Sequence, residues 1–557
     1  MTQESSKVHV PWQSVYDELG VVAPALDDRP LGHFVEQHAR NFPDTIALRY
    51  FDQTVTYRQL NREANQLAHA LVKLGVTHGD VVGLHMPNIP QYMVAILAIT
   101  KIGAAGSGVS TLLSPLELEH QITDADLNVL ITLDSLSDRI SGETLHKTGK
   151  LKSVVVVSAT HESPSLPVIE GVACYDYQQL IVSESHQFDQ RQVSGEDTMM
   201  VQYTGGTTGP PKGAKLSVRC LMSNVVQSNV YQPWVTGKEL LITGYPMSHG
   251  AGLAYAITTV RFAATMVLIP NPRDIEYLCQ QMFLYPPTRI AAVPSLFQLL
   301  LACDTFHTID FSKLKVANTG AAPMTTELQN AVEAVIGEGK LCERFGMTET
   351  GPAHLSSPAS RGKPGSVGIP IPLADTRIVD LETGTKEMPF GEPGEIITSG
   401  PQVMTGYLNL PEQTARALRS WRGKTWMYTG DVGYMDEEGY VTLCDRAKDM
   451  LIVGGYKVFS VEIEDKLSSL PILAGSAVVG IPDQARPGNE IVTLYVALEE
   501  DARNMSVTDV EDQILTFCRD TMAPYKVPKQ VHILDQIPLT TVGKIDKKLL
   551  RSNAVGL

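Results

Sequence analysis

The chain has 557 residues, 43% of them hydrophobic and 19% charged, which is typical of a soluble globular protein with several packing units. Its formal net charge of −16 argues against general nucleic-acid binding and against a polybasic membrane anchor. Seven scattered cysteines without a C-x-x-C pair favour a reducing compartment and argue against structural zinc. The N-terminus lacks the apolar core of a signal peptide and no apolar run is long enough to span a membrane, so we expect a cytoplasmic protein.

Strand-like and helix-like segments alternate from about residue 46 onward. Residues 45–51 and 81–86 predict strands, and the segment between them predicts an amphipathic helix. Further buried-strand signals follow at 153–158, 266–270 and 289–294, with amphipathic segments between them. This alternation predicts parallel sheets covered by helices.

The pattern changes twice in the C-terminal part of the chain. Residues 362–444 consist of short strands punctuated by glycine, which predicts a β-rich, barrel-like subdomain. A new unit with its own strands and two helices follows, and we place the domain boundary at 445–448. The predicted domains are therefore 1–445 and 446–557. The second helix of the small domain is expected to open with a capping box from Thr508 to Glu511.

Residues 203–213, YTGGTTGPPKG, combine glycines, threonine hydroxyls and one lysine directly after a predicted buried strand. Glycines expose backbone N–H groups, so such a loop can cradle phosphates, although a plain surface turn explains a glycine-rich stretch about equally well. A Walker loop is excluded, because Lys212 stands between Pro211 and Gly213 and not before a serine or threonine.

Several other motifs are weak when each is taken alone. They are NTGAAPM at 318–324, ERFGMTETG at 343–351, YTGDVGYMDEEGY at 428–440, DRAKDMLIVGGYKV at 445–458 and PLTTVGKIDKKLL at 538–550. Each has a plain structural explanation as a turn, a hairpin or a solvated loop. Their order and spacing, together with YTGGTTGPPKG and GPQVMTGYLN, resemble the adenylate-forming superfamily of acyl-CoA synthetases, luciferases and peptide-synthetase adenylation domains. The resemblance extends from about residue 30 to residue 551.

The resemblance implies an α/β fold in which a large N-terminal domain has two doubly wound sheets and a β-barrel-like subdomain. A small, mobile α+β C-terminal domain would carry the catalytic lysine. The implied activity is ATP-dependent, AMP-forming activation of a carboxylic acid, followed by transfer to coenzyme A, with Mg²⁺ as metal. Such a site must hold a triphosphate, bring a second anion against it and stabilise the charge that develops at the α-phosphorus.

The resemblance also assigns site residues by position. Lys544, Glu349 and Thr204 are the implied catalytic residues, and Thr204 and Glu349 the implied metal-holding pair, because hard cations prefer oxygen ligands. Gly454, Gly455 and Tyr456 would line the coenzyme A tunnel. The implied nucleotide-binding residues are Thr204, Gly205, Gly206, Thr207, Thr208, Gly209, Lys212, Gly320, Ala321, Ala322, Phe345, Gly346, Met347, Thr348, Asp431, Arg446, Lys448 and Lys544.

The acyl pocket implied by the resemblance contains His249, Leu253, Val293, Gly320 and Met347. Amino-acid-activating relatives carry an aspartate in the segment that corresponds to 245–253, and this chain has none there. The segments shared with bacterial long-chain fatty acid–CoA ligases therefore predict a medium- to long-chain fatty acid substrate. Ser460 replaces the proline usual in the family, and its hydroxyl could cap the helix that follows.

Alternatives remain open at this point. The acid could be aryl, and the acceptor could be a carrier protein, or the reaction could stop at the acyl-adenylate. A catalytically silent binding protein is disfavoured by the retained charged residues Lys544, Glu349, Asp431 and Arg446. The expected partners are small molecules and not nucleic acid. The sequence leaves a homodimer and loose peripheral membrane association open.

Overall fold

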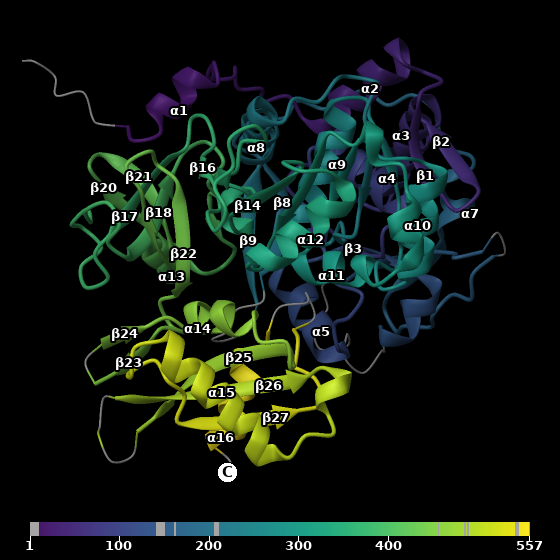
Figure 1. Cartoon of the computed structure of the whole chain (residues 1–557). Helices are drawn as coiled ribbons and strands as arrows, with labels where there is room; N and C mark the ends of the chain where they lie inside the picture. The colour runs from purple at the N-terminus through teal and green to yellow at the C-terminus, as the bar shows by residue number, and fades with distance from the viewer. Residues whose placement is uncertain are drawn as a thin grey trace, which may run out of the picture.

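The computed structural model describes residues 10–140, 151–160, 163–204, 211–454, 456–483, 486, 489–540 and 545–555 (Figure 1). Two large sheets form the N-terminal part, a smaller antiparallel sheet lies beside them, and a separate C-terminal unit lies below them in the view of Figure 1. Among the described residues, no helix combines the length and the apolar character that crossing a bilayer requires.

Within the described residues the first sheet has nine strands, whose central strands run parallel. In spatial order they are β16 (Ile369–Pro370), β15 (Leu355–Ser356), β14 (Leu341–Phe345), β13 (Val316–Gly320), β12 (Arg289–Ala291), β10 (Leu240–Thr243), β11 (Thr265–Val267), β1 (Ile46–Tyr50) and β2 (Gln53–Thr56).

The second sheet has eight strands in the described part of the chain and is also largely parallel. Its order is β19 (Gly406–Tyr407), β9 (Lys212–Ser217), β8 (Thr198–Thr204), β4 (Ala105–Gly108), β3 (Val81–His85), β5 (Val129–Leu133), β6 (Ser153–Val157) and β7 (Ala173–Asp176).

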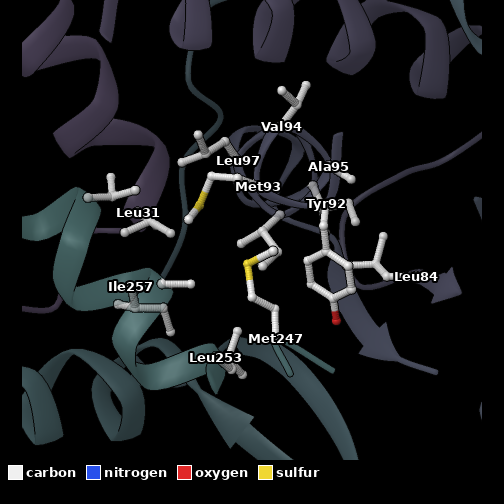
Figure 2. Close-up of a cluster of buried hydrophobic side chains, with 14 of the residues drawn as sticks. Leu31, Leu84, Tyr92, Met93, Val94, Ala95, Leu97, Met247, Leu253 and Ile257 are labelled. Atoms are coloured by element: carbon white, nitrogen blue, oxygen red, sulfur yellow. The ribbon is translucent and has the colours of Figure 1, made fainter. Parts of the chain in front are cut away.

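Helices cover these sheets and fill the space between them. Because α4 (Pro90–Ile102) is apolar all round, it is buried almost completely, and its Met93 and Leu97 lie near Met247 and Leu253 (Figure 2). The other helices of this part are α1 (Gln13–Glu18), α2 (Leu31–Asn41), α3 (Tyr57–Lys73), α5 (Pro115–Asp124), α7 (Tyr177–Ile181), α8 (Val218–Tyr231), α9 (Gly250–Arg261), α10 (Ile275–Leu284), α11 (Pro294–Leu301) and α12 (Thr326–Ile336).

The glycine-punctuated segment 362–444 forms most of an antiparallel sheet that has five strands within the described residues. β21 is long and pairs with three neighbours, so it organises this sheet. The strands are β17 (Asp375–Val379), β18 (Gly394–Ser399), β21 (Lys424–Met435), β20 (Leu418–Trp421) and β22 (Val441–Arg446), and α13 (Pro411–Ala417) precedes β20.

The C-terminal unit has its own buried apolar cluster, formed between residues 451 and 527. A hairpin of β23 (Leu451–Val453) and β24 (Tyr456–Val458) precedes α14 (Ser460–Leu467). The rest consists of β25 (Leu473–Pro482), β26 (Glu490–Leu498), α15 (Val507–Thr521), β27 (Gln530–Leu534) and α16 (Lys547–Val555). The predicted alternating α/β architecture with a smaller C-terminal unit is confirmed.

Two local expectations in this unit are wrong. Helix α15 is capped by Ser506, whose hydroxyl oxygen accepts from the backbone N–H of Asp509, because an equivalent Ser-x-x-Asp pattern occurs two residues before the predicted box. Ser460 does not cap α14 with its side chain. Its N–H and hydroxyl both donate to the carboxylate of Asp445, at 2.5 and 2.6 Å, so Asp445 satisfies this helix start.

Candidate active site

A cavity of about 2520 Å³ opens where the two large sheets, the five-stranded sheet and the C-terminal unit meet. Its walls include the ends of β8, β13 and β14. Ligand sites in α/β sheets commonly lie at the carboxyl ends of strands, so this is an expected place for a binding site. We call the part around Thr204, Phe345 and Asp431 the nucleotide half. The part between α8, α9 and β14 is called the acyl half.

Glu349 is the centre of the nucleotide half, where it is only 4% exposed. The hydroxyl of Tyr407 donates to its Oε1 atom at 2.7 Å, which leaves the second oxygen for another partner. The ring of Tyr407 also lies beneath the ammonium of Lys212, 4.4 Å from the ring centre. Thr204 ends β8 and lines the same cavity, so a hydroxyl, a carboxylate and a cation are brought together.

The other predicted nucleotide contacts lie on three separated segments. Ala321 follows β13 with φ of +68°, a left-handed conformation that is costly for alanine and that turns the backbone at the cavity wall. Phe345 lines the cavity and meets His354 edge-on at 5.2 Å. Asp431 and Arg446 are cross-strand partners and form an ion pair at 3.0 Å.

The remaining residues of this prediction that the structure describes, Gly320, Ala322, Gly346, Met347, Thr348 and Lys448, also line the cavity. Burial, with Arg446 adding to it, lowers the pKa of Lys448 to about 8. Residues 205–209, the centre of the predicted phosphate loop, and Lys544 lie outside the described residues. Thr540 and Ile545, on either side of the Lys544 segment, line the cavity.

Four of the five residues predicted for the acyl pocket line the cavity, and one does not. His249, Val293, Gly320 and Met347 line the cavity. Leu253 does not, because its side chain is fully buried in the apolar core against the α4 side of the sheet (Figure 2). His249 precedes α9 as its N-cap in an extended conformation, whereas Leu253 lies within α9 and packs into the protein interior.

The two predicted coenzyme A residues that the structure describes, Gly454 and Tyr456, do not line the cavity. Gly454 has φ of +59° and donates its N–H to Asn489 Oδ1 at 2.9 Å. Tyr456 is 59% exposed and stacks on Tyr525 with ring centres 4.5 Å apart. Neither lines the cavity, and Gly455 lies outside the described residues.

Tyr407, Glu343 and Arg344 are among the cavity residues to which the sequence gave no role. Tyr407 lies within the quoted GPQVMTGYLN segment, but nothing in that pattern indicated its bond to Glu349. Glu343 and Arg344 precede Phe345 on β14, and both line the cavity. Burial raises the pKa of the Glu343 carboxyl to about 8. The available signal was a pair of adjacent charged residues, Glu343 and Arg344, within an otherwise apolar strand.

The chain belongs to the AMP-binding enzyme family, whose sequence pattern matches residues 35–408, and residues 462–544 match the AMP-binding enzyme C-terminal domain. It is 33% identical to a long-chain-fatty-acid–CoA ligase of Escherichia coli O6:H1, over 94% of each chain. Among solved structures, ATP-bound MatB from Rhodopseudomonas palustris matches with a TM-score of 0.83 and 28% identity, over 94% of this chain and 99% of that one. The anthranilate CoA ligase AuaEII in complex with anthranoyl-AMP matches with a TM-score of 0.84 and 26% identity, over 96% and 99%.

The protein is therefore an AMP-forming acid–thiol ligase that uses ATP, Mg²⁺ and coenzyme A. The donor set of the cavity fits these groups. Among the described residues no cluster of three or more His, Cys, Asp or Glu side chains could hold a metal. The carboxylate of Glu349 and the hydroxyl of Thr204 are oxygen ligands of the kind that Mg²⁺ prefers.

Proposed function

We propose that this ligase activates a medium- to long-chain fatty acid to the acyl-adenylate and transfers the acyl group to coenzyme A. The observation that carries this proposal is the segment 245–253, which enters the cavity without a carboxylate that could pair with a substrate ammonium. The similarity to a fatty acid–CoA ligase over nearly the full length supports the same substrate class. ATP and coenzyme A are small soluble substrates, which suits a cytoplasmic location.

In this proposal, the nucleotide half holds ATP by several weak contacts. Phe345 and the backbone turn at Ala321 would enclose the adenine, and Asp431, with two acceptor oxygens, would bind the ribose diol. Glu349 and Thr204 would hold the magnesium ion, which neutralises phosphate charge when bound. Lys212 would contact the phosphates from the end of the glycine-rich loop.

We further propose that Lys544 bridges the carboxylate and the α-phosphate during adenylation. The unit from residue 446 onward would then turn about residues 445–448, so that Gly454, Gly455 and Tyr456 replace Lys544 and form the thiol tunnel. Two observations support this order of events. Thr540 and Ile545, on either side of the Lys544 segment, line the cavity, whereas Gly454 and Tyr456 do not. This is the arrangement expected for the adenylation step. A homodimer or loose membrane contact is compatible with the proposal and not needed for it.

The direct test is pyrophosphate release with a panel of acids, with and without coenzyme A. Fatty acids should give a much higher kcat/KM than α-amino acids, and coenzyme A should be consumed in equal amount to the acid. Preference for substituted benzoates or cinnamates would instead establish an aryl-CoA ligase. Release of pyrophosphate without consumption of coenzyme A would indicate either a carrier-protein acceptor or a reaction that stops at the acyl-adenylate.

A further inference from the structure

The acyl half of the cavity contains a group of polar side chains that a hydrocarbon chain does not explain, and we call this group the polar end. Asn224 and Ser228 of α8, Tyr255 and Thr258 of α9, and Arg344 of β14 all line it. The hydroxyl of Ser228 is buried without a hydrogen-bond partner. An unpaired buried polar group costs about 1–3 kcal/mol, so such groups usually await a ligand or water.

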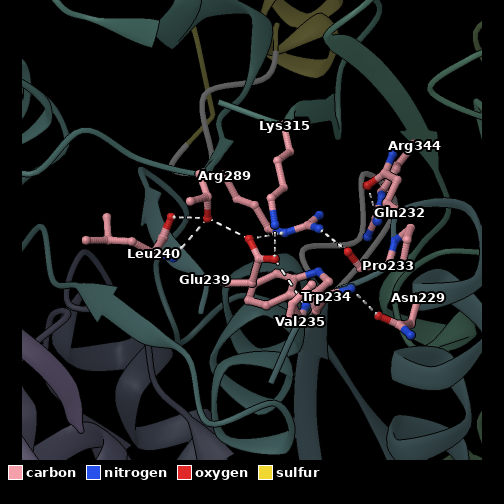
Figure 3. Close-up of polar contacts among 11 residues, drawn as sticks. Asn229, Gln232, Pro233, Trp234, Val235, Glu239, Leu240, Arg289, Lys315 and Arg344 are labelled. Carbon is pink, nitrogen blue, oxygen red and sulfur yellow. Dashed lines mark hydrogen bonds and ion pairs between the residues drawn. The ribbon is translucent and has the colours of Figure 1, made fainter. Parts of the chain in front are cut away.

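Arg344 supplies the charge at this polar end. It lies opposite Gly320 in the β13–β14 register, where the glycine adds no side chain beside it. One guanidinium nitrogen donates to Gln232 Oε1 at 2.6 Å, while the Nε atom is buried without a partner (Figure 3). The guanidinium centre lies 6.0 Å from the ring centre of Tyr255. In the described part of the chain, Gln232 is the only hydrogen-bonding partner of this side chain and no carboxylate pairs with it.

Neighbouring charges do not neutralise Arg344. The carboxylate of Glu239 is already shared by two cations, at 3.3 Å from Arg289 and 2.6 Å from Lys315 (Figure 3). Arg289 carries the same charge as Arg344, and after burial the repulsion between the two guanidinium groups helps to lower the pKa of Arg289. Burial raises the pKa of Glu343, the residue before Arg344 on β14, to about 8, which favours its neutral form near pH 7. The polar end is therefore positively charged.

A planar guanidinium with unused N–H donors and no counter-ion matches a carboxylate, which accepts two parallel hydrogen bonds from such a fork. A plain alkyl chain would instead remove water from Arg344 without replacing its hydrogen bonds, at a cost in binding. We propose that the preferred substrates are aliphatic acids with a second carboxylate at the far end of the chain, and that Arg344 binds this distal carboxylate. This inference rests on the proposed aliphatic substrate class and narrows it to dicarboxylic acids.

The first experiment uses the wild-type enzyme and measures pyrophosphate release with matched acids. Octanoic, decanoic, dodecanoic and hexadecanoic acids are each compared with the dicarboxylic acid and the ω-hydroxy acid of the same length. The dicarboxylic acid should have at least a roughly 10-fold higher kcat/KM at the best length, with the ω-hydroxy acid between the two. Equal values, or a preference for the monocarboxylic acid, would overturn the role of Arg344 and leave the fatty-acid proposal intact. Activation of aryl acids alone would reject the fatty-acid proposal itself.

The second experiment changes the arginine. Arg344→Met keeps the length and removes the charge, so the dicarboxylic acid should lose about 100-fold in kcat/KM while the monocarboxylic acid is unchanged or improves. Arg344→Lys keeps the charge without the fork and should restore part of the preference. The control is Arg422→Met, an exposed arginine outside the cavity, which should leave both acids unchanged. Equal losses for both acids in the two Arg344 variants would show that the residue is structural and would refute the proposal.

Discussion

The nucleotide half of the cavity is built mainly from strand ends and turns, whereas the acyl half is built from side chains of α8, α9 and β14. Residues of the nucleotide half come from short, separate sequence motifs, each with a positive φ angle, a strand end or a charged side chain at a fixed place. The acyl half depends on which side chains happen to converge from distant helices. The nucleotide half can therefore be recognised from local sequence, whereas the acyl half is defined only by tertiary packing.

The largest expected effect separates the two half-reactions. A contact between unit charges about 4 Å apart, at an effective dielectric near 20, amounts to about 4 kcal/mol, so Lys544→Ala should slow adenylation by about 10³-fold. The same variant should still convert pre-made acyl-adenylate and coenzyme A to thioester at nearly the wild-type rate. Single-turnover measurements of each half-reaction provide the check.

The matched control for Lys544→Ala is Gly455→Leu, because a side chain there should obstruct the thiol path and not the ATP site. Adenylation should then persist while thioester formation is lost. Equal loss of both half-reactions in both variants would contradict an exchange of faces by the C-terminal unit and would point to one fixed site.

A second, smaller effect tests whether a change in the nucleotide half affects the adenylation of every acid equally. Glu349→Gln keeps the size of the side chain but removes the charge that would hold magnesium, so adenylation should fall by about 10²-fold or more, by the same factor for every acid. The measurement is kcat/KM for several acids across a magnesium titration. Near-normal turnover at low magnesium would show that Glu349 does not hold the metal.

Tyr407→Phe is a milder perturbation of the same site as Glu349→Gln. It removes the hydroxyl that donates to Glu349 at 2.7 Å but keeps the ring beneath Lys212. A hydrogen bond to a charged group contributes about 1.5–3 kcal/mol, so we expect about a 10-fold loss, again equal for all acids. A loss confined to some acids would place Tyr407 in the recognition of the acyl chain.

The smallest effect concerns pH and Glu343, which lies on β14 between the two halves. Its pKa is raised to about 8 in the folded protein, so between its ordinary pKa of 4.5 and 8 the folded state binds more protons than the unfolded state. Stability should therefore fall as pH rises through this window, by at most about 1.4 kcal/mol per pH unit from this group. Glu343→Gln should remove this component. The Tm of the variant minus the Tm of the wild type should therefore increase from pH 5 to pH 8. A constant difference would show that the carboxyl titrates normally.

The same contrast explains how much the sequence could predict. The parallel sheets, the β-rich segment and the family followed from periodicity and from ordered motifs, and the segments around Glu349 and Asp431 do meet at one cavity. Leu253 could not be placed, because a shift of a few residues along α9 decides between cavity and core. The partners of Arg344 could not be foreseen either, since Gln232 is 112 residues away and contacts it only after both sheets have formed. The cap of α15 was misplaced because two equivalent patterns compete within a few residues.

Asp445 connects the five-stranded sheet to the C-terminal unit by backbone pairing and by hydrogen bonds of its side chain. Its backbone pairs with Val432 in the five-stranded sheet, while its carboxylate receives two hydrogen bonds from Ser460 of the C-terminal unit. Lys547, which begins the helix after the Lys544 segment, donates to the same Ser460 hydroxyl at 2.5 Å. Any turn of the C-terminal unit that separates Asp445 from Ser460 must break this chain of bonds first. If the C-terminal unit turns between the two half-reactions as proposed, the hydrogen bonds of Asp445 would have to open between them.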